Sequence, residues 1–188
     1  MDRFDALDLA ESEFERFLRR VAEDQWCLPT PCTEWDVRAV VNHVVAAGDW
    51  FIALLEGCSR EDGTALLLAT DVLQPDPVTA FAAQRPRFRA TFTAPGALQR
   101  VGHHLVADMT GAQLLSGRVI DLTLHAWDIA RATGDDDRLD PQLASVALKI
   151  YRPIAPILVA NGYAAPSLEA IGDASDQARL LALSGRRS

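Results

Sequence analysis

The amino-acid sequence predicts an all-α protein. Apolar residues recur at helical spacing over most of its 188 residues, and runs that alternate apolar and polar residues over the length of a strand are nearly absent. The sequence contains no internal repeat and no low-complexity linker. We therefore expect residues 1–188 to form a single domain.

The first helix is predicted over about residues 2–24. It is amphipathic, with acids near its start and Arg19 and Arg20 near its end, an arrangement that the helix dipole favours. Two prolines within the segment Leu28-Pro29-Thr30-Pro31-Cys32 favour extended backbone and separate this helix from the next.

The second helix is expected to begin at Thr33 and to run to about Gly57. Thr33 has an acid three residues later, Asp36, in a near match to the capping box. Apolar residues lie on more than one face of this segment, a pattern that is typical of a central helix.

The middle of the chain is predicted to hold a short helix at 64–70 and a longer one at 77–93. Pro86 lies inside the longer helix and should kink or split it, because proline lacks the backbone N–H that a helix requires. The following connector at 94–110 contains proline and glycine, and a short strand is predicted there around 99–106.

Two further helices are predicted at 112–133 and at 141–160, the second of them capped by Asp140. Pro153 and Pro156 should interrupt the second one. Residues 175–183 are expected to add a last helical turn to an otherwise irregular tail.

The charge of the chain bears on its partners. A formal net charge of -8 argues against nucleic acid and against an anionic membrane surface, because both attract basic proteins. We therefore expect small-molecule partners and an enzyme-like protein. Lys149 is the only lysine beside many arginines, a bias typical of a GC-rich bacterial genome.

Three cysteines without a Cys-x-x-Cys pair argue against a disulfide framework or a thiolate zinc site and favour a reduced, cytoplasmic setting. The N-terminus lacks the pattern of a signal peptide. No uninterrupted run of about 18 apolar residues occurs, so no membrane span is expected.

One helix carries the most informative pattern. Arg118, Asp121, His125 and Asp128 are spaced three, four and three apart, so they share one face of an otherwise apolar helix. Such a row is unfavourable unless its members are paired or hold a metal. His43, among valines of the second helix, is a third candidate ligand, and two histidines with a carboxylate form a common set in catalytic metal sites. The alternatives are a satisfied core histidine and a buried hydrogen-bond network in a helical homodimer.

Each of three residues near these candidate ligands has two alternative expected roles. Asp128 is expected to orient His125 as a hydrogen-bond acceptor, or to replace Asp121 as the ligand. Arg118 is expected either to form a salt bridge with Asp121 or another acid, or to bind an anion. Trp127 is expected in the core or lining the pocket.

Other chemically active residues have simpler expected roles. His103 and His104 are expected as an exposed loop pair, and Trp35 and Trp50 as core residues. Cys32 precedes the second helix, where the helix dipole lowers a thiol pKa. A buried structural cysteine is nevertheless the favoured interpretation over a nucleophile.

Two motifs resemble one known family. PTPCTEWDVR at 29–38, followed by VNHV at 41–44, and DLTLHAWDIARATG at 121–134 resemble the DinB-like metal-binding proteins related to mycothiol-dependent maleylpyruvate isomerase. The resemblance covers most of the chain, including RLLALSGR at 179–186. It implies a four-helix bundle of up-down-down-up topology with additional short helices.

The resemblance also implies a divalent metal at His43, Asp121 and His125, with zinc as the default ion and nickel or another ion as alternatives. The acid is a glutamate in the isomerase and a third histidine in other branches. The superfamily includes transferases that use thiols such as mycothiol, and a Lewis-acidic ion lowers the pKa of a bound thiol.

We therefore expect a metal-dependent S-transferase or isomerase that joins a small thiol to an electrophilic small molecule. The alternative is a DinB-like protein that binds a metal or ligand without turnover. The isomerase has a further C-terminal domain for which this chain lacks room, so a substrate other than maleylpyruvate is expected.

Overall fold

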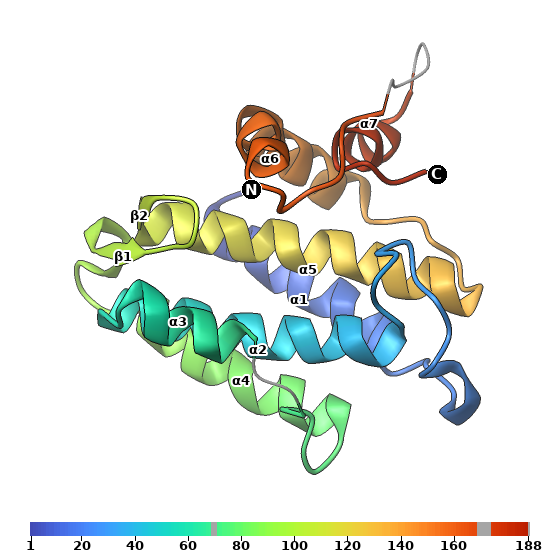
Figure 1. Ribbon diagram of the computed structural model, residues 1–188, viewed down its shortest axis with the longest axis horizontal. Helices are drawn as coiled ribbons and strands as arrows, with labels where there is room; N and C mark the ends of the chain where they lie inside the picture. The colour runs from blue at the N-terminus through green and yellow to red at the C-terminus, as the bar shows by residue number, and fades with distance from the viewer. Residues whose placement is uncertain (69–70, 169–173, 188) are drawn as a thin grey trace.

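The computed structural model describes residues 1–68, 71–168 and 174–187, and this part of the chain is mostly helical, as predicted (Figure 1). A short antiparallel hairpin interrupts the series of helices. The elements are α1 (Arg3–Leu18), η1 (Glu23–Gln25), α2 (Val37–Glu56), α3 (Arg60–Leu67), α4 (Pro77–Thr93), η2 (Ala97–Gln99), β1 (Val101–His103), β2 (Asp108–Thr110), α5 (Gly111–Thr133), α6 (Pro141–Ala160) and α7 (Asp176–Leu183).

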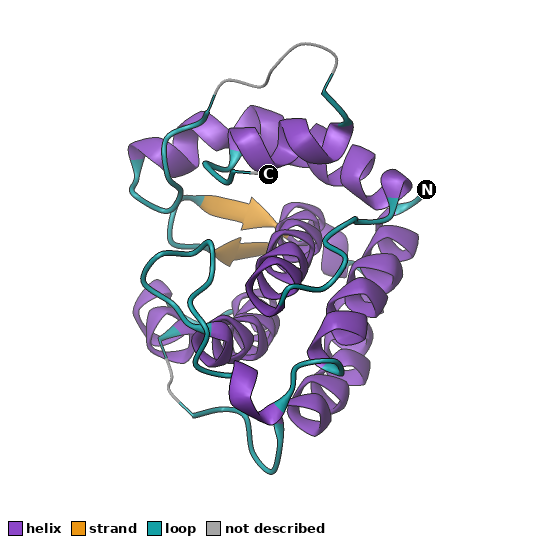
Figure 2. Ribbon diagram, turned by 90° about the vertical axis from the view of Figure 1, so that its right-hand side faces the viewer, coloured by secondary structure: helices purple, strands orange, loops and turns teal. Residues whose placement is uncertain are grey.

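Helix α5 lies at the centre of this arrangement and packs against α1, α2 and α6. Helix α4 packs against α2 and α1, while α7 packs against α6. Figures 1 and 2 show α6 and α7 as a separate layer on the side of α5 that faces away from α2 and α4. Polar side chains on α5 are therefore surrounded by protein on several sides.

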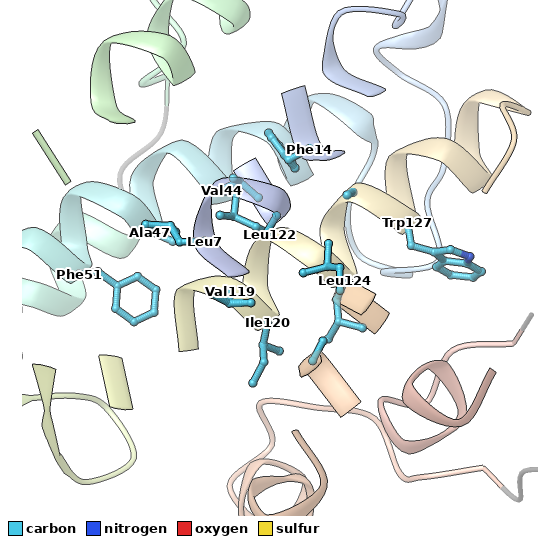
Figure 3. Close-up of a cluster of buried hydrophobic side chains, with 14 of the residues drawn as sticks. Leu7, Phe14, Val44, Ala47, Phe51, Val119, Ile120, Leu122, Leu124 and Trp127 are labelled. Atoms are coloured by element: carbon cyan, nitrogen blue, oxygen red, sulfur yellow. The ribbon is translucent and has the colours of Figure 1, made fainter. Parts of the chain in front are cut away.

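The apolar core includes side chains of α1, α2 and α5, part of which Figure 3 shows. Leu7 and Phe14 of α1 meet Val44 of α2 and Val119 and Leu122 of α5, and all five side chains are buried. Each such side chain stabilises the fold by roughly 1.5–3 kcal/mol. The core thus holds α2 and α5 in a fixed relation, which the site between them requires.

The first helix is shorter than the sequence pattern predicts. Helix α1 ends at Leu18, and Ala22 has extended backbone (φ -75, ψ 160). The side chain of Gln25 accepts a hydrogen bond from the Ala22 N–H at 2.9 Å. This local bond replaces the next helical one and starts the 3-10 turn η1, so the prediction of a helix to residue 24 is wrong.

The second helix begins later than predicted. Its N-cap is Asp36, whose side chain accepts from the backbone N–H of Ala39 at 2.8 Å, and Thr33 belongs to the preceding loop. That loop, 29–36, is closed by a bridge between Pro29 and Asp36 and by the Thr30 hydroxyl, which donates to the Trp35 carbonyl at 2.8 Å. The predicted end at Gly57 is confirmed, with a left-handed φ of 94° that suits glycine.

The prolines do not break their helices. Helix α4 continues through Pro86, and α6 continues through Pro153 and Pro156. All three prolines are exposed, as are the residues four positions before them. The carbonyl that each proline leaves without a helical partner can therefore bond to water, which removes the main penalty.

The remaining boundaries mostly follow the prediction. The short helix predicted at 64–70 is α3, which begins at Arg60, and residues 69–70 lie outside the described part. The predicted strand near 99–106 is β1, paired with β2, which the sequence analysis missed. Helix α7 confirms the predicted last helix.

Two helices, α2 and α6, have the length and apolar composition of a membrane span. Most of the apolar window of α2 is buried inside the fold (67%), whereas less of the α6 window is (33%). This is weak evidence for a membrane span, since the buried core helix of a soluble protein has the same composition.

Candidate metal centre

Helices α2 and α5 bring His43, Asp121 and His125 together. The Nε2 atom of His43 lies 3.1 Å from Oδ1 of Asp121, and the Nε2 atom of His125 lies 3.6 Å from the same oxygen. One donor atom from each of the three side chains lies within 4.8 Å of the others. The three residues that the sequence pattern singled out as ligands thus share one small region.

The geometry of this cluster suits a small divalent ion. Two donors about 2.1 Å from an ion at a tetrahedral angle lie roughly 3.4 Å apart. The two distances to Asp121 Oδ1, 3.1 and 3.6 Å, bracket that separation. Two imidazoles and a carboxylate also form the donor set of many catalytic zinc sites, which keep a fourth position open.

Arg118 holds the second oxygen of Asp121. Its Nη1 donates to Asp121 Oδ2 at 2.9 Å and to the Val44 carbonyl at 2.8 Å, and its Nη2 donates to Gln84 at 3.0 Å. The contact with Asp121 is the expected salt bridge, and the Arg118 side chain is only 2% exposed. The alternative of binding a free anion finds no support, because protein groups take up these donors.

The charge state of Asp121 follows from these contacts. Burial favours its neutral acid, but the hydrogen bond with His43 and the charges of His43, His125 and Arg118 outweigh burial and lower the pKa of Asp121 to about 2. The carboxylate is therefore ionised at neutral pH, as a metal ligand must be. Burial lowers the pKa of Arg118.

Gln84 of α4 is a part of the site that the sequence analysis missed. Besides accepting from Arg118, its side chain donates to the Val45 carbonyl of α2. It reaches this position over Gly48, where a Cβ atom would lie 1.9 Å from Gln84 Oε1. Gly48 was the available signal, because a glycine inside a helix often marks the close approach of another group.

Asp128 contacts His125 at Nδ1, the ring nitrogen that does not face Asp121. Its Oδ2 accepts from His125 Nδ1 at 2.9 Å, and its side chain is completely buried. The role of orienting His125 is therefore supported by geometry. Replacement of Asp121 by Asp128 as the ligand is disfavoured, because Asp128 faces Nδ1 while the Nε2 atom faces Asp121 and His43.

Arg186, from the end of the chain, also reaches Asp128. Its Nε and Nη2 atoms donate to the two carboxylate oxygens at 2.8 and 2.7 Å. These bonds and charges outweigh the effect of burial and lower the pKa of Asp128. In the sequence, the segment 179–186 is marked only by the family resemblance, and no local pattern predicts the role of Arg186.

Cys32 lies against the same carboxylate, with Sγ 3.3 Å from Asp128 Oδ2. Burial, followed by the negative charge of Asp128, raises the pKa of the Cys32 thiol to about 12. The expected lowering of the pKa by the helix dipole is wrong, since α2 begins only at Val37 and the Asp128 carboxylate lies next to the thiol. Cys32 is only partly buried, but its raised pKa supports the favoured interpretation of a structural thiol over a nucleophile.

Of the two tryptophans near the site, Trp35 has a role that was not expected, whereas Trp127 has the first of its two expected roles. The ring of Trp35 lies 4.6 Å from the His43 ring and 6.0 Å from the His125 ring, between centroids. Trp35 is partly buried against the core and also covers the imidazoles. Trp127 is fully buried and lies at one end of the apolar cluster in Figure 3. Trp127 is therefore a core residue in this structure.

The histidine pair of the connector is not uniformly exposed. His103 is exposed and contacts Asp108 at 2.9 Å, as expected of a loop residue. The ring of His104 packs on Trp50 at 4.7 Å, and burial, with the charge of Arg60, lowers the pKa of His104 to about 4. The expectation of an exposed pair is therefore wrong for His104.

This shift predicts an acid-sensitive contribution to stability. As the pH falls from about 6.5 to about 4, unfolded chains protonate His104 while the folded protein keeps it neutral, so the free energy of unfolding should fall by ~1–3 kcal/mol. His104→Asn, which retains an acceptor for the Val106 N–H, should lose this part of the pH dependence. Urea unfolding across that range measures it, with His103→Asn as the control. Equal pH dependence in His104→Asn and the unmodified chain would refute the assignment.

These observations define a mostly helical protein with a partly buried histidine–carboxylate cluster suited to a metal ion. The chain belongs to the mycothiol maleylpyruvate isomerase N-terminal domain family, whose model matches residues 7–130. The matched region includes His43, Asp121, His125 and Asp128.

Two Mycobacterium tuberculosis proteins are similar to most of the chain. They are Uncharacterized protein Rv0738 of strain ATCC 25618 / H37Rv and Uncharacterized protein MT0763 of strain CDC 1551 / Oshkosh. Each is 31% identical over 158 residues, which cover 82% of this chain and 80% of the relative. A comparison with solved structures found no match.

Proposed function

We propose that this protein binds one divalent metal ion through His43, Asp121 and His125. With this ion it would act as a thiol S-transferase or isomerase. The observation that carries the proposal is the approach of both Nε2 atoms to a single oxygen of Asp121, at 3.1 and 3.6 Å. Zinc is the default ion for this donor set. Mycothiol or a similar small thiol is the proposed co-substrate, in keeping with the family.

The proposal includes the architecture around the site. Helices α1, α2, α4 and α5 would form the DinB-like four-helix bundle of up-down-down-up topology, with the remaining elements as additions. The mutual packing of α1 with α5, α2 with α4, and α2 with α5 supports it. A single domain in the cytoplasm is part of the same proposal.

Each residue has a defined task in this scheme. His43 and His125 offer neutral Nε2 donors, and Asp121 supplies the negative charge. Arg118 keeps the Asp121 carboxylate turned toward the two histidines, and Trp35 shields one side of the imidazoles. A divalent ion at this position would lower the pKa of a thiol that binds beside it, so that the thiolate attacks an electrophile at neutral pH.

A binding protein without turnover is the second candidate, and the pairing of the charged groups around the cluster favours it. The charged groups around the cluster are paired with one another: Arg118 with Asp121, and Arg186 with Asp128. The Cys32 thiol, with its raised pKa, is a poor nucleophile. The thiol and the electrophile must therefore both come from solution if the protein is an enzyme.

The test begins with protein that has no histidine tag and is purified without chelators. We expect about one divalent ion per chain by elemental analysis, and loss of that ion in His43→Gln but not in His103→Gln, which changes an exposed histidine. A metal-free protein that takes up neither zinc nor nickel on titration would refute the metal proposal. Incubating loaded protein with mycothiol or another small thiol and monochlorobimane then tests the transferase activity: accelerated conjugation supports the enzyme, and no conjugation above background across several thiols counts against a transferase.

A further inference from the structure

The segment that follows α7 places the side chain of Arg186 inside the protein. Gly185, which follows α7, has a left-handed φ of 76°, and the Arg186 backbone N–H donates to the Leu181 carbonyl at 2.8 Å. Helix α7 packs on α6, and α6 packs on α5. The Arg186 side chain is consequently only 12% exposed and points to α5.

The contact that Arg186 makes is the strong form of an arginine–carboxylate pair. Two different nitrogens donate to the two oxygens of Asp128, at 2.8 and 2.7 Å. Two parallel bonds fix the plane of the carboxylate as well as its position. Since Asp128 is completely buried, this guanidinium also supplies the positive charge that such a carboxylate requires.

The orientation of Asp128 decides which nitrogen of His125 carries the proton. Asp128 approaches Nδ1 at 2.9 Å, whereas Asp121 approaches Nε2 at 3.6 Å. The two carboxylates compete for the imidazole proton, and the shorter contact favours protonation of Nδ1. In that tautomer the lone pair of Nε2 is free to bind a metal.

The same contact also bears on a second group of donor atoms. Cys32, His125 and Asp128 have ligand atoms within 4.8 Å of one another. The Nη2 atom of Arg186 lies 3.3 Å from the Cys32 sulfur and 2.7 Å from Asp128 Oδ2. The guanidinium therefore already serves as the cation of this group, which argues against a second metal ion there.

We propose that Arg186 is a positioning residue for the candidate metal centre: through its paired contact with Asp128 it holds His125 in the Nδ1-protonated tautomer, with Nε2 directed at Asp121 and His43. Only the consequence for metal affinity rests on the function proposed above. Arg186 lies beyond the region that the family model matches, residues 7–130, so the site depends on a segment outside that region.

The direct test is the tautomer of His125 in metal-free protein. Nitrogen-15 NMR of labelled histidine distinguishes a protonated from an unprotonated ring nitrogen, and spectra of His43→Gln and His125→Gln assign the signals. We expect protonated Nδ1 in the unmodified chain and in Arg187→Gln, which changes the neighbouring exposed arginine. Arg186→Gln should move the proton toward Nε2 and weaken zinc binding by roughly 10–100-fold.

Arg186→Lys keeps the charge but cannot form two parallel bonds, so it should fold and lie between the unmodified chain and Arg186→Gln in both measurements. If either Arg186→Lys or a folded Arg186→Gln keeps both the tautomer and the zinc affinity of the unmodified chain, the positioning role is refuted. If the unmodified chain binds no metal, but Arg186→Gln shows the expected change of tautomer, the proposed function is refuted and the role of Arg186 is supported.

Discussion

Replacing Asp121 by asparagine is expected to lower the affinity for a divalent ion by more than ~100-fold, beyond the 10–100-fold typical of losing a partner outside the ligand set. Asp121 is the only anion among the three proposed ligands. Its neutral replacement would leave the positive charge of Arg118 close to the ion, with Nη1 bonded to the side chain at position 121. The affinity is measured by competition with a chromophoric chelator, and the metal content by elemental analysis.

The chain offers a matched control for this substitution. Asp108 also contacts a histidine, with His103 Nδ1 2.9 Å from Oδ1, but both side chains are exposed. Asp108→Asn should leave metal binding unchanged, because an exposed acid–histidine pair without a third donor is not a metal site. Stoichiometric, tight binding in Asp121→Asn would exclude Asp121 as a ligand and require another set of donors.

The second large effect is expected on stability. Arg118→Met removes the buried cation that balances Asp121, and we expect the free energy of unfolding of the metal-free protein to fall by ~3–5 kcal/mol. The loss includes the bonds to Val44 and Gln84 across three helices. Urea unfolding measures it, and Arg20→Met, at an exposed pair with Asp135, should change stability by only ~0–1 kcal/mol.

A double-mutant cycle isolates the buried ion pair. Arg118→Met together with Asp121→Asn should lose less stability than the sum of the two single changes, with a coupling of ~0.5–3 kcal/mol. The reason is that the second substitution removes a charge which the first has left without its partner. Additive losses would show that Arg118 acts by filling space and bonding α2 to α4, and not by balancing Asp121.

Local signals located most of the helices. Helix α4 has the predicted limits 77–93, and α5 ends at Thr133 before a glycine with a left-handed φ of 75°. The errors lie where a local hydrogen bond competes with the helical pattern, as at Gln25, or where Asp36 instead of Thr33 caps a helix. Periodicity does not report such competition, so the limits of α1 and α2 were misplaced.

The sequence by itself determined the mostly helical class and the candidate ligands, because spacing along one helix is a local property. Asp121 and His125 share a face of α5 wherever that helix is placed, and His43 is marked by its valine neighbours.

Only the tertiary structure decided which groups surround them. Gln84, Trp35 and Arg186 come from three other segments, and their contacts with the cluster depend on how α4, the loop 29–36 and α7 pack. Distances between residues far apart in sequence are set by the packing of the whole core, and no local pattern encodes them.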